Sequence, residues 1–147
     1  MQKHYDGLEK MHLNSPINEL IKSKINISQG KSQINFKNST SMRSALDNIH
    51  NAYIFMGLEA AAFFAANSLI EDVLVSTKSF EIIFSKPTNS EELIAKGTFE
   101  EKSMGNYIIS AELFDLNEKL IAKAKGVFRR SKNLLEDIKN YQWQAFP

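Results

Sequence analysis

The feature of this sequence that most constrains its fold is a strongly apolar stretch between Ala52 and Ala66. It contains no proline, a single glycine and a single charged residue, Glu59. Apolar residues occupy every side of a helical wheel, and a helix that is apolar all round is a buried helix. Crossing a bilayer takes about 20 mostly apolar residues, so this helix is too short to span a membrane. The stretch therefore predicts a central helix buried in a globular domain, with one carboxylate inside.

Length and composition narrow the class of protein. A chain of 147 residues is expected to form a single domain, residues 1–147, with a full core. It has no cysteine, which excludes disulfides, thiolate nucleophiles and cysteine-ligated metal centres. We predict no metal site and no cofactor. Eighteen basic and 17 acidic residues leave a net charge of +1, so neither nucleic acid nor an anionic membrane is an expected partner. Without a signal peptide or transmembrane segment, the expected location is cytoplasmic.

The segment before the central helix predicts short elements. Residues 1–14 form a polar N-terminal arm that fits either a short helix or a loose arm. Ser15-Pro16 then offers an N-cap followed by proline at the first helical position. It predicts a short amphipathic helix whose apolar face is formed by Ile17, Leu20 and Ile21.

Two alternating segments follow, at residues 24–27 and 33–36, and they predict a pair of strands joined by a turn at Gly30. Residues 37–49 are rich in Asn, Ser and Asp and predict a long loop. Met42 and Leu46 are its candidates for burial.

The segment after the central helix predicts sheet followed by one more helix. Four apolar-rich strands are expected at residues 72–86, 92–101, 107–114 and 119–130. The last of them has an apolar face and a basic face, and the apolar face is predicted to lie against the helix. Residues 133–142 carry Leu134, Leu135, Ile138 and Tyr141 at helical spacing, which predicts a C-terminal helix followed by Trp143.

Successive strands joined by short turns form an antiparallel sheet, and such a sheet needs one face covered. A long helix that lies in the concave face of a curved sheet is itself buried and also covers that face of the sheet. The predicted class is therefore α+β, with a curved antiparallel sheet wrapped around one long central helix and a core spanning about residues 17–131.

Several motifs in this arrangement resemble the hotdog fold, specifically acyl-CoA thioesterases of the phenylacetic-acid-pathway type. That family has a His-Gly-Gly motif where the central helix begins and a carboxylate nine residues after the histidine. His50 and Glu59 stand at that spacing, and Phe55 falls where the family often has an aromatic or aliphatic residue. Further similarities are found at Asn67-Ser68, Phe84–Pro87 and Glu91–Gly97.

The resemblance implies an acyl-CoA thioesterase in which the substrate is a coenzyme A thioester. The backbone N–H of Asn51, the residue after the histidine, would polarise the thioester carbonyl. Glu59 would act as general base or nucleophile, and His50 would hold the loop or the substrate. Elementary chemistry is consistent with these roles, because a helix N-terminus offers free N–H groups to a developing oxyanion. Desolvation would raise the pKa of a buried carboxyl towards the useful range.

The sequence also departs from the family, since Asn51 and Ala52 replace the two glycines. Asn51 keeps its N–H, but its side chain would narrow the approach of the substrate. This replacement favours an alternative function, a non-catalytic acyl-CoA-binding hotdog protein. The presence of Glu59 favours the enzyme.

Each candidate residue also has a structural interpretation. Glu59 fits a buried ion pair or a hydrogen bond across a dimer interface equally well before the motif is considered. Asn48, Ala52 and Phe55 are predicted to line the substrate site. A basic trio at the end of the last strand, Arg129, Arg130 and Lys132, fits a site for nucleotide phosphates or a solvated strand end.

The fold implied by the resemblance leaves a sheet edge and half of a tunnel exposed in the monomer. A homodimer is therefore the expected assembly, with a dimer of dimers as the larger alternative.

Overall fold

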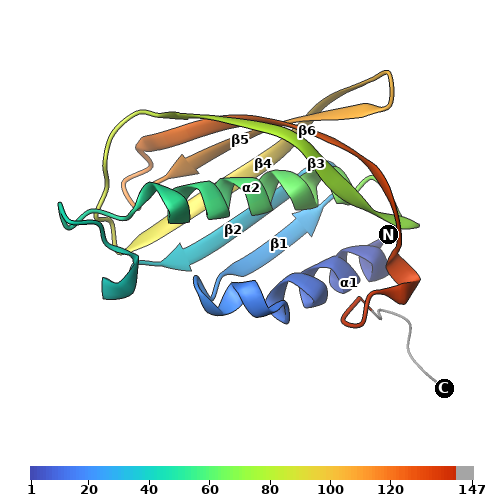
Figure 1. Cartoon of the computed structure of the whole chain (residues 1–147), viewed down its shortest axis with the longest axis horizontal. Coiled ribbons are helices and arrows are strands. Elements are labelled where there is room, and N and C mark those ends of the chain that lie inside the picture. The colour runs from blue at the N-terminus through green and yellow to red at the C-terminus, as the bar shows by residue number, and fades with distance from the viewer. Residues whose placement is uncertain (142–147) are drawn as a thin grey trace.

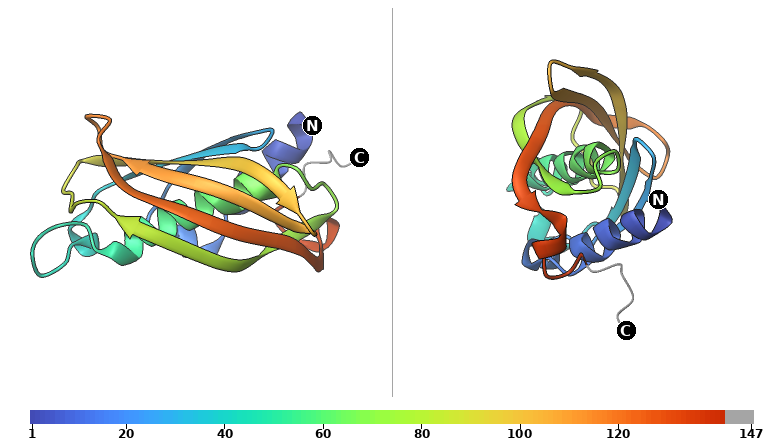
Figure 2. Two further views of the ribbon diagram at one scale, coloured as in Figure 1. Left: turned by 90° about the horizontal axis from the view of Figure 1, so that it is seen from above. Right: turned by 90° about the vertical axis from the view of Figure 1, so that its right-hand side faces the viewer.

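The structure is a computed structural model that describes residues 1–141. Six antiparallel strands form one sheet in the order β1-β2-β4-β5-β6-β3, and a single long helix, α2, lies against it. Figure 1 shows α2 running along the sheet, and the end-on view in Figure 2 shows the strands curving around it. This is the predicted α+β architecture.

The elements have the following bounds. The N-terminal segment contains α1 (Gln2–Leu13) and the short 3₁₀ helix η1 (Pro16–Glu19), followed by β1 (Lys24–Ser28) and β2 (Lys31–Lys37). A second 3₁₀ turn, η2 (Thr40–Met42), precedes α2 (Asn51–Asn67). The remaining elements are β3 (Val73–Phe84), β4 (Glu92–Ser103), β5 (Asn106–Phe114), β6 (Leu120–Leu134) and η3 (Leu135–Asp137).

Helix α2 lies very close to the sheet because small residues face each other at the contact. Ala61, Ala62, Ala65 and Ala66 are all fully buried. On β4, a Cβ atom added to Gly97 would lie 2.7 Å from the carbonyl carbon of Ala61, which is too close for any side chain. The alanine-rich sequence therefore has a direct structural use, since it lets the strand backbone touch the helix backbone.

A second, smaller cluster of buried residues fastens α1 to the domain. It joins Tyr5 and Leu8 of α1 to Ile27, Phe64, Leu135 and Tyr141. His4 is buried there as well, with its Nε2 at 2.8 Å from the Asn67 carbonyl oxygen. Residues 1–14 are thus a packed helix, and the loose-arm alternative for them was wrong.

The predicted short amphipathic helix after Pro16 was also partly wrong. Only one turn of 3₁₀ helix forms, and Ile17 and Leu20 are 57% and 50% exposed, while Ile21 is buried. In the loop that follows β2, Met42 is buried as predicted, but Leu46 is 84% exposed. In both segments, the local pattern of apolar residues predicted burial, but the tertiary structure leaves some of these side chains exposed.

The C-terminal helix predicted for residues 133–142 was wrong. β6 continues to Leu134, which pairs with Val73, and the Leu135 N–H donates to the Asp72 carbonyl oxygen over 2.9 Å. η3 then forms a single turn. Backbone N–H and C=O groups that bond to the β3 segment are not available for the hydrogen bonds of a helix. Residue 142 and Trp143 lie outside the described residues.

Candidate active site

Glu59 lies in the middle of α2 on the side that faces the start of β3. Its side chain is half-buried, and its Oε2 accepts a hydrogen bond from the Thr77 hydroxyl over 2.8 Å. Burial raises the pKa of Glu59 above its ordinary value of 4.5, and the hydrogen bond from Thr77 opposes this rise. In the part of the chain that the structure describes, the ion pairs are Arg43–Asp47 and Arg130–Asp72, so Glu59 has no basic partner there. The buried ion pair considered for Glu59 is absent from the described chain.

Thr77 lies directly before an irregularity in β3. The pairing of β3 with β6 shifts register between Thr77 and Ser79, a β-bulge. Bulges re-aim side chains and are common beside functional sites. Here Val73, Val75 and Thr77 share the helix-facing side before the bulge, and Phe80 takes up that side after it. Thr77 therefore faces α2 on the same side as Val75, with its hydroxyl within reach of the carboxylate, and the bulge that follows moves this side to Phe80.

A cavity of about 270 Å³ opens beside Glu59. Its helix wall is apolar and consists of Met56, Ala60, Phe63 and Phe64 around the carboxylate. The opposite wall is formed by the N-terminal segment, from His12, Ser15, Ile17, Asn18 and Ile21.

His12 is the most distinctive member of that opposite wall. Its Nε2 lies 2.7 Å from the Ser23 hydroxyl oxygen, and burial lowers the pKa of His12 from 6.5 to about 4. The imidazole is therefore neutral at physiological pH. Sequence reasoning missed this residue, because a buried histidine on a helix has no local signature.

The N-terminus of α2 presents a different group of atoms. His50 is the N-cap, and its Nδ1 accepts the Ala52 N–H over 2.9 Å. The Tyr53 and Ile54 N–H groups donate to the His50 carbonyl oxygen. The Asn51 N–H has no acceptor among the described residues. The amide that the resemblance assigns to carbonyl polarisation is therefore the one left free in this turn.

One chain does not bring these two groups together. Asn51 and Glu59 are eight residues apart in the same helix, which corresponds to about 12 Å along its axis at 1.5 Å per residue. One carbonyl group cannot contact both. Asn51 and Glu59 therefore both lie on α2, but Asn51 is at the N-terminus of the helix and Glu59 is in its middle.

The other predicted site residues surround the N-terminal half of α2. Phe55 is 44% exposed and makes an edge-to-face contact with Phe80 of β3, with ring centroids 5.4 Å apart. Ala52 is exposed. Asn48 is half-buried in the preceding loop, where its carbonyl oxygen accepts the Ser44 N–H over 2.7 Å. All three lie near the Asn51 amide in sequence, and Ala52 and Phe55 are exposed.

The predicted basic trio is only partly assembled. Arg129 and Arg130 line a cleft of about 500 Å³ together with two lysines of other strands, Lys78 and Lys102. Lys132, two residues further along β6, is exposed and does not line this cleft, so its predicted contact with the substrate stays a prediction. Arg130 binds both carboxylate oxygens of Asp72, at 3.0 and 2.6 Å.

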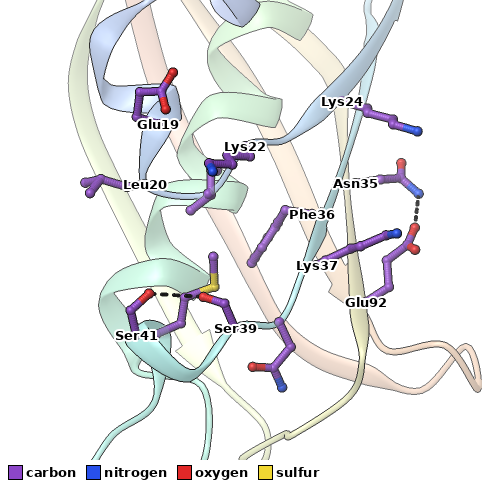
Figure 3. A pocket seen from close by; sticks show the side chains of 13 residues that line it. Glu19, Leu20, Lys22, Lys24, Asn35, Phe36, Lys37, Ser39, Ser41 and Glu92 are labelled. Atoms are coloured by element: carbon purple, nitrogen blue, oxygen red, sulfur yellow. Dashed lines mark hydrogen bonds between the residues drawn. The ribbon is translucent and has the colours of Figure 1, made fainter.

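A further hollow, of about 600 Å³, contains none of the predicted site residues. It lies between the turn after η1 and the η2 loop, and Figure 3 shows Phe36 among the residues that line it. Lys24 and Lys37 are directed away from Phe36 in that view, and Glu92 is held by Asn35 at 3.1 Å. Because its charges are mixed and outward-facing, this hollow does not assemble a reactive group.

The described chain has neither a metal cluster nor a membrane-spanning helix. Within residues 1–141, no three His, Asp or Glu side chains are grouped so that they could hold a metal ion. No helix in the same range has the length and hydropathy needed to cross a membrane.

Comparison with known proteins shows similarity in structure alone. No protein-family model and no curated protein sequence matches the chain. The PaaI protein of the phenylacetic acid degradation operon of E. coli superposes with a TM-score of 0.82 at 16% identity, over 90% of this chain and 96% of that one. A thioesterase family protein from Silicibacter pomeroyi gives a TM-score of 0.80 at 15% identity, over 86% and 96%.

A variant of the phenylacetic acid degradation protein PaaI from Thermus thermophilus gives a TM-score of 0.72 at 16% identity. The match covers 80% of this chain and 100% of that one. At these identities the likeness concerns the fold. The chain has the hotdog fold, as the motifs predicted.

Proposed function

We propose that this protein is an acyl-CoA thioesterase. The observation that carries the proposal is Glu59, a half-buried carboxylate with a raised pKa that borders an apolar cavity in the middle of the central helix. A general base works best when its pKa lies near the operating pH, and burial moves Glu59 in that direction. The apolar cavity offers space for an acyl group next to the carboxylate.

The proposed chemistry is hydrolysis of the thioester. Glu59 removes a proton from water that attacks the carbonyl carbon, or attacks that carbon itself as the nucleophile. The free N–H of Asn51 at the N-terminus of α2 stabilises the negative charge on the carbonyl oxygen. The carbon–sulfur bond then breaks, and the coenzyme A thiolate takes up a proton. Where Glu59 is the nucleophile, this step leaves an acyl–Glu59 anhydride, which water hydrolyses to release the carboxylic acid and restore the carboxylate.

The separation of about 12 Å along α2 implies that the two groups come from different protomers. We propose a homodimer in which the Asn51 amide of one protomer meets Glu59 of the other. β3 supports this assembly, because it is an edge strand of 12 residues with one side unpaired in the single chain. A dimer would have a mass of about 33 kDa, twice the 16.7 kDa of the chain. Light scattering that shows only the single-chain mass would contradict it.

The cavity also suggests the place of the acyl group. It has a volume of about 270 Å³ and borders Glu59, and its apolar helix wall would contact the hydrocarbon part of the substrate. The cytoplasm remains the predicted location.

The direct test measures thiol release from short, long and aromatic acyl-CoAs. Glu59→Gln keeps the shape and the hydrogen bond from Thr77 but removes the base, so we expect a fall in kcat of about a hundredfold or more. Glu81→Gln, a carboxylate on the exposed side of the same strand as Thr77, serves as the matched control and should retain the parent rate. Equal rates for the parent and Glu59→Gln would remove Glu59 from the mechanism.

The alternative function is a non-catalytic acyl-CoA-binding protein. It is favoured by one observation, the side chains of Asn51 and Ala52 at the position where the resembling enzymes have two glycines. Restoring both glycines should raise the rate if these side chains obstruct the carbonyl. Tight acyl-CoA binding without turnover, in both the parent and the double-glycine variant, would select the binding protein.

A further inference from the structure

The cavity beside Glu59 is bordered on its opposite wall by a histidine whose two ring nitrogens have different surroundings. His12 is 7% exposed, and its Nε2 lies 2.7 Å from the Ser23 hydroxyl oxygen. Its ring also packs edge to face against Phe64, with ring centroids 5.2 Å apart. These two contacts hold the imidazole in a fixed orientation at the cavity wall.

The direction of the hydrogen bond between His12 and Ser23 follows from a third residue, Asn18. Its Oδ1 accepts both the Ser23 N–H, over 3.2 Å, and the Ser23 hydroxyl, over 2.8 Å. A serine hydroxyl has one proton to donate, so its oxygen accepts at the contact with His12, and the donor there is the Nε2–H. Burial lowers the pKa of His12 to about 4, so the ring is neutral and Nδ1 is an acceptor with a free lone pair.

This direction also excludes one interpretation of the Ser23–His12 contact. A serine nucleophile activated by a histidine must donate its proton to the imidazole. Here the Ser23 proton is directed to Asn18 instead, and Ser23 does not line the cavity. The pair therefore orients His12 and does not form a nucleophilic centre.

The free nitrogen of His12 is open to the cavity. Nδ1 has no hydrogen-bond partner within residues 1–141. In that part of the chain, the Ser32 hydroxyl is the only unpartnered side-chain polar atom that is fully enclosed, so Nδ1 keeps contact with open space. The open space that His12 lines is the cavity beside Glu59. An occupant of this cavity thus meets an oriented, neutral hydrogen-bond acceptor.

The charge of the cavity narrows the choice of donor. Among the described residues that line it, Glu59 is the only charged one. A second carboxylate would be repelled by Glu59 and would meet no cationic side chain. An ammonium group would lower the pKa of Glu59 through its charge, away from the range that suits a base near neutral pH. A neutral hydroxyl can donate to Nδ1 without either effect.

We propose that His12 determines the acyl specificity of the enzyme by accepting, at Nδ1, a hydrogen bond from a hydroxyl group on the acyl chain. This inference rests on the proposed function and names the substrate class, which is hydroxyacyl thioesters. When the thioester is at Glu59, the acyl group extends across the cavity, and its part remote from the carbonyl meets His12 on the opposite wall. An acyl group without a hydroxyl leaves Nδ1 unpaired in a largely apolar cavity, which lowers its affinity.

The first test compares acyl-CoAs that differ in a single group. The probes are ω-hydroxyacyl-CoAs of six, eight and ten carbons, with the unsubstituted acyl-CoA and the ω-carboxyacyl-CoA of each length. At one or more lengths, the hydroxyl should raise kcat/KM about tenfold over the unsubstituted chain, the effect of one hydrogen bond. The carboxylate should make the poorest substrate at each length. Equal kcat/KM for the hydroxylated and unsubstituted chains at every length would overturn the proposal.

Substitutions assign the preference to a single side chain. His12→Phe keeps an aromatic ring beside Phe64 and removes both nitrogens, so the preference for the hydroxyl should disappear. His4→Phe is the matched control, since His4 is also a buried histidine of α1 but does not line the cavity, and this variant should keep the preference. The preference is a ratio of two rates in one protein, so a partial loss of folded protein does not change it. A preference that survives His12→Phe would contradict the proposal.

The position of the proton is tested separately, without hydrolysis. Nitrogen-15 NMR of the parent should show His12 with its proton on Nε2. Ser23→Ala removes the acceptor of that proton outside the cavity, so the proton should distribute over both nitrogens and the preference for the hydroxyl should fall. A proton on Nδ1 in the parent would overturn the proposal.

These measurements separate this inference from the proposed function. If no acyl-CoA is hydrolysed, calorimetry still compares the binding of the ω-hydroxyacyl-CoA with that of its unsubstituted counterpart. Tighter binding of the hydroxylated chain that is lost in His12→Phe would then support the site in a binding protein. Hydrolysis without any preference for the hydroxyl would confirm the enzyme and refute the role of His12.

Discussion

The Thr77 hydroxyl donates a hydrogen bond of 2.8 Å to the Glu59 carboxylate, and so joins the edge strand β3 to the middle of α2. This contact acts against the effect of burial, because it stabilises the charged form of a carboxyl whose pKa burial raises. Two opposing effects thus set the pKa of Glu59, burial and the hydrogen bond from Thr77. The second effect comes from a single side chain that can be substituted.

Thr77→Val removes this donor while it keeps the shape of the side chain, so the pKa of Glu59 should rise further. If the ionised carboxylate is the active form, the acid limb of the kcat/KM profile should move to higher pH in this variant. Thr77→Ser keeps the hydroxyl and should retain the parent profile. Superimposable acid limbs in Thr77→Val and the parent would show that the contact does not tune the reacting group.

Glu59→Gln should stabilise the protein at neutral pH. A carboxyl with a raised pKa in the folded state binds more protons there than in the unfolded chain, so its stabilising contribution is lost as pH rises above about 4.5. Glutamine carries no charge to desolvate. Thermal unfolding should show a higher Tm for Glu59→Gln at pH 7, with a difference from the parent that disappears below pH 4.5. A lower Tm at pH 7 would mean that the charge is stabilised by the fold.

His12 should make the fold sensitive to acid. Burial lowers the pKa of His12 to about 4, so below pH 6.5 the unfolded chain takes up a proton that the folded state does not bind. Stability should therefore fall as pH decreases from 6.5 to 4, by up to about 3 kcal/mol from this residue. Urea unfolding across that range should show a smaller loss for His12→Gln. The pKa of His4 is also lowered by burial, and because both proteins carry His4, the comparison isolates His12.

Substitution of His50 distinguishes a capping role from contact with the substrate. His50→Ala removes the acceptor for the Ala52 N–H and should destabilise the protein by about 1 kcal/mol. His50→Asn supplies another good N-cap and should restore stability. If His50 only caps α2, thioester hydrolysis should recover in His50→Asn as well. Restored stability without restored activity would assign the imidazole to the substrate.

Gly97→Ala should be destabilising although the added group is small. The new methyl group would meet the backbone of Ala61 at a contact where neither β4 nor α2 has space to move. We expect a loss of about 1–3 kcal/mol in chemical unfolding, the usual effect of overpacking a core. Gly30→Ala, at a positive φ in the β1–β2 turn, is a useful comparison because its cost would come from backbone strain instead.

Local sequence pattern was sufficient for the central helix and for all six strands. An all-apolar, alanine-rich stretch without proline has few alternatives to a buried helix, and period-two alternation is a direct sign of a half-buried strand. The spacing of His50 and Glu59 likewise located Glu59 on α2 and His50 at the N-terminal end of this helix, where the structure has it as the N-cap. Each of these predictions depends on residues that are close together in the sequence.

Tertiary structure decided the features that depend on distant residues. Residues 133–142 had helical spacing, but pairing with the start of β3 extended β6 to Leu134, and the Leu135 N–H donates to the Asp72 carbonyl oxygen. His12 carries no local sign that it will form the wall opposite Glu59. Lys78 and Lys102 line one cleft with Arg129 because long-range strand pairing places β3 and the β4–β5 hairpin beside β6.

The central helix shows the same division. Its sequence accounts for its burial and for its single carboxylate. The hydroxyl that holds this carboxylate, the cavity beside it and the distance that separates it from the Asn51 amide come from long-range packing, which no window of neighbouring residues contains.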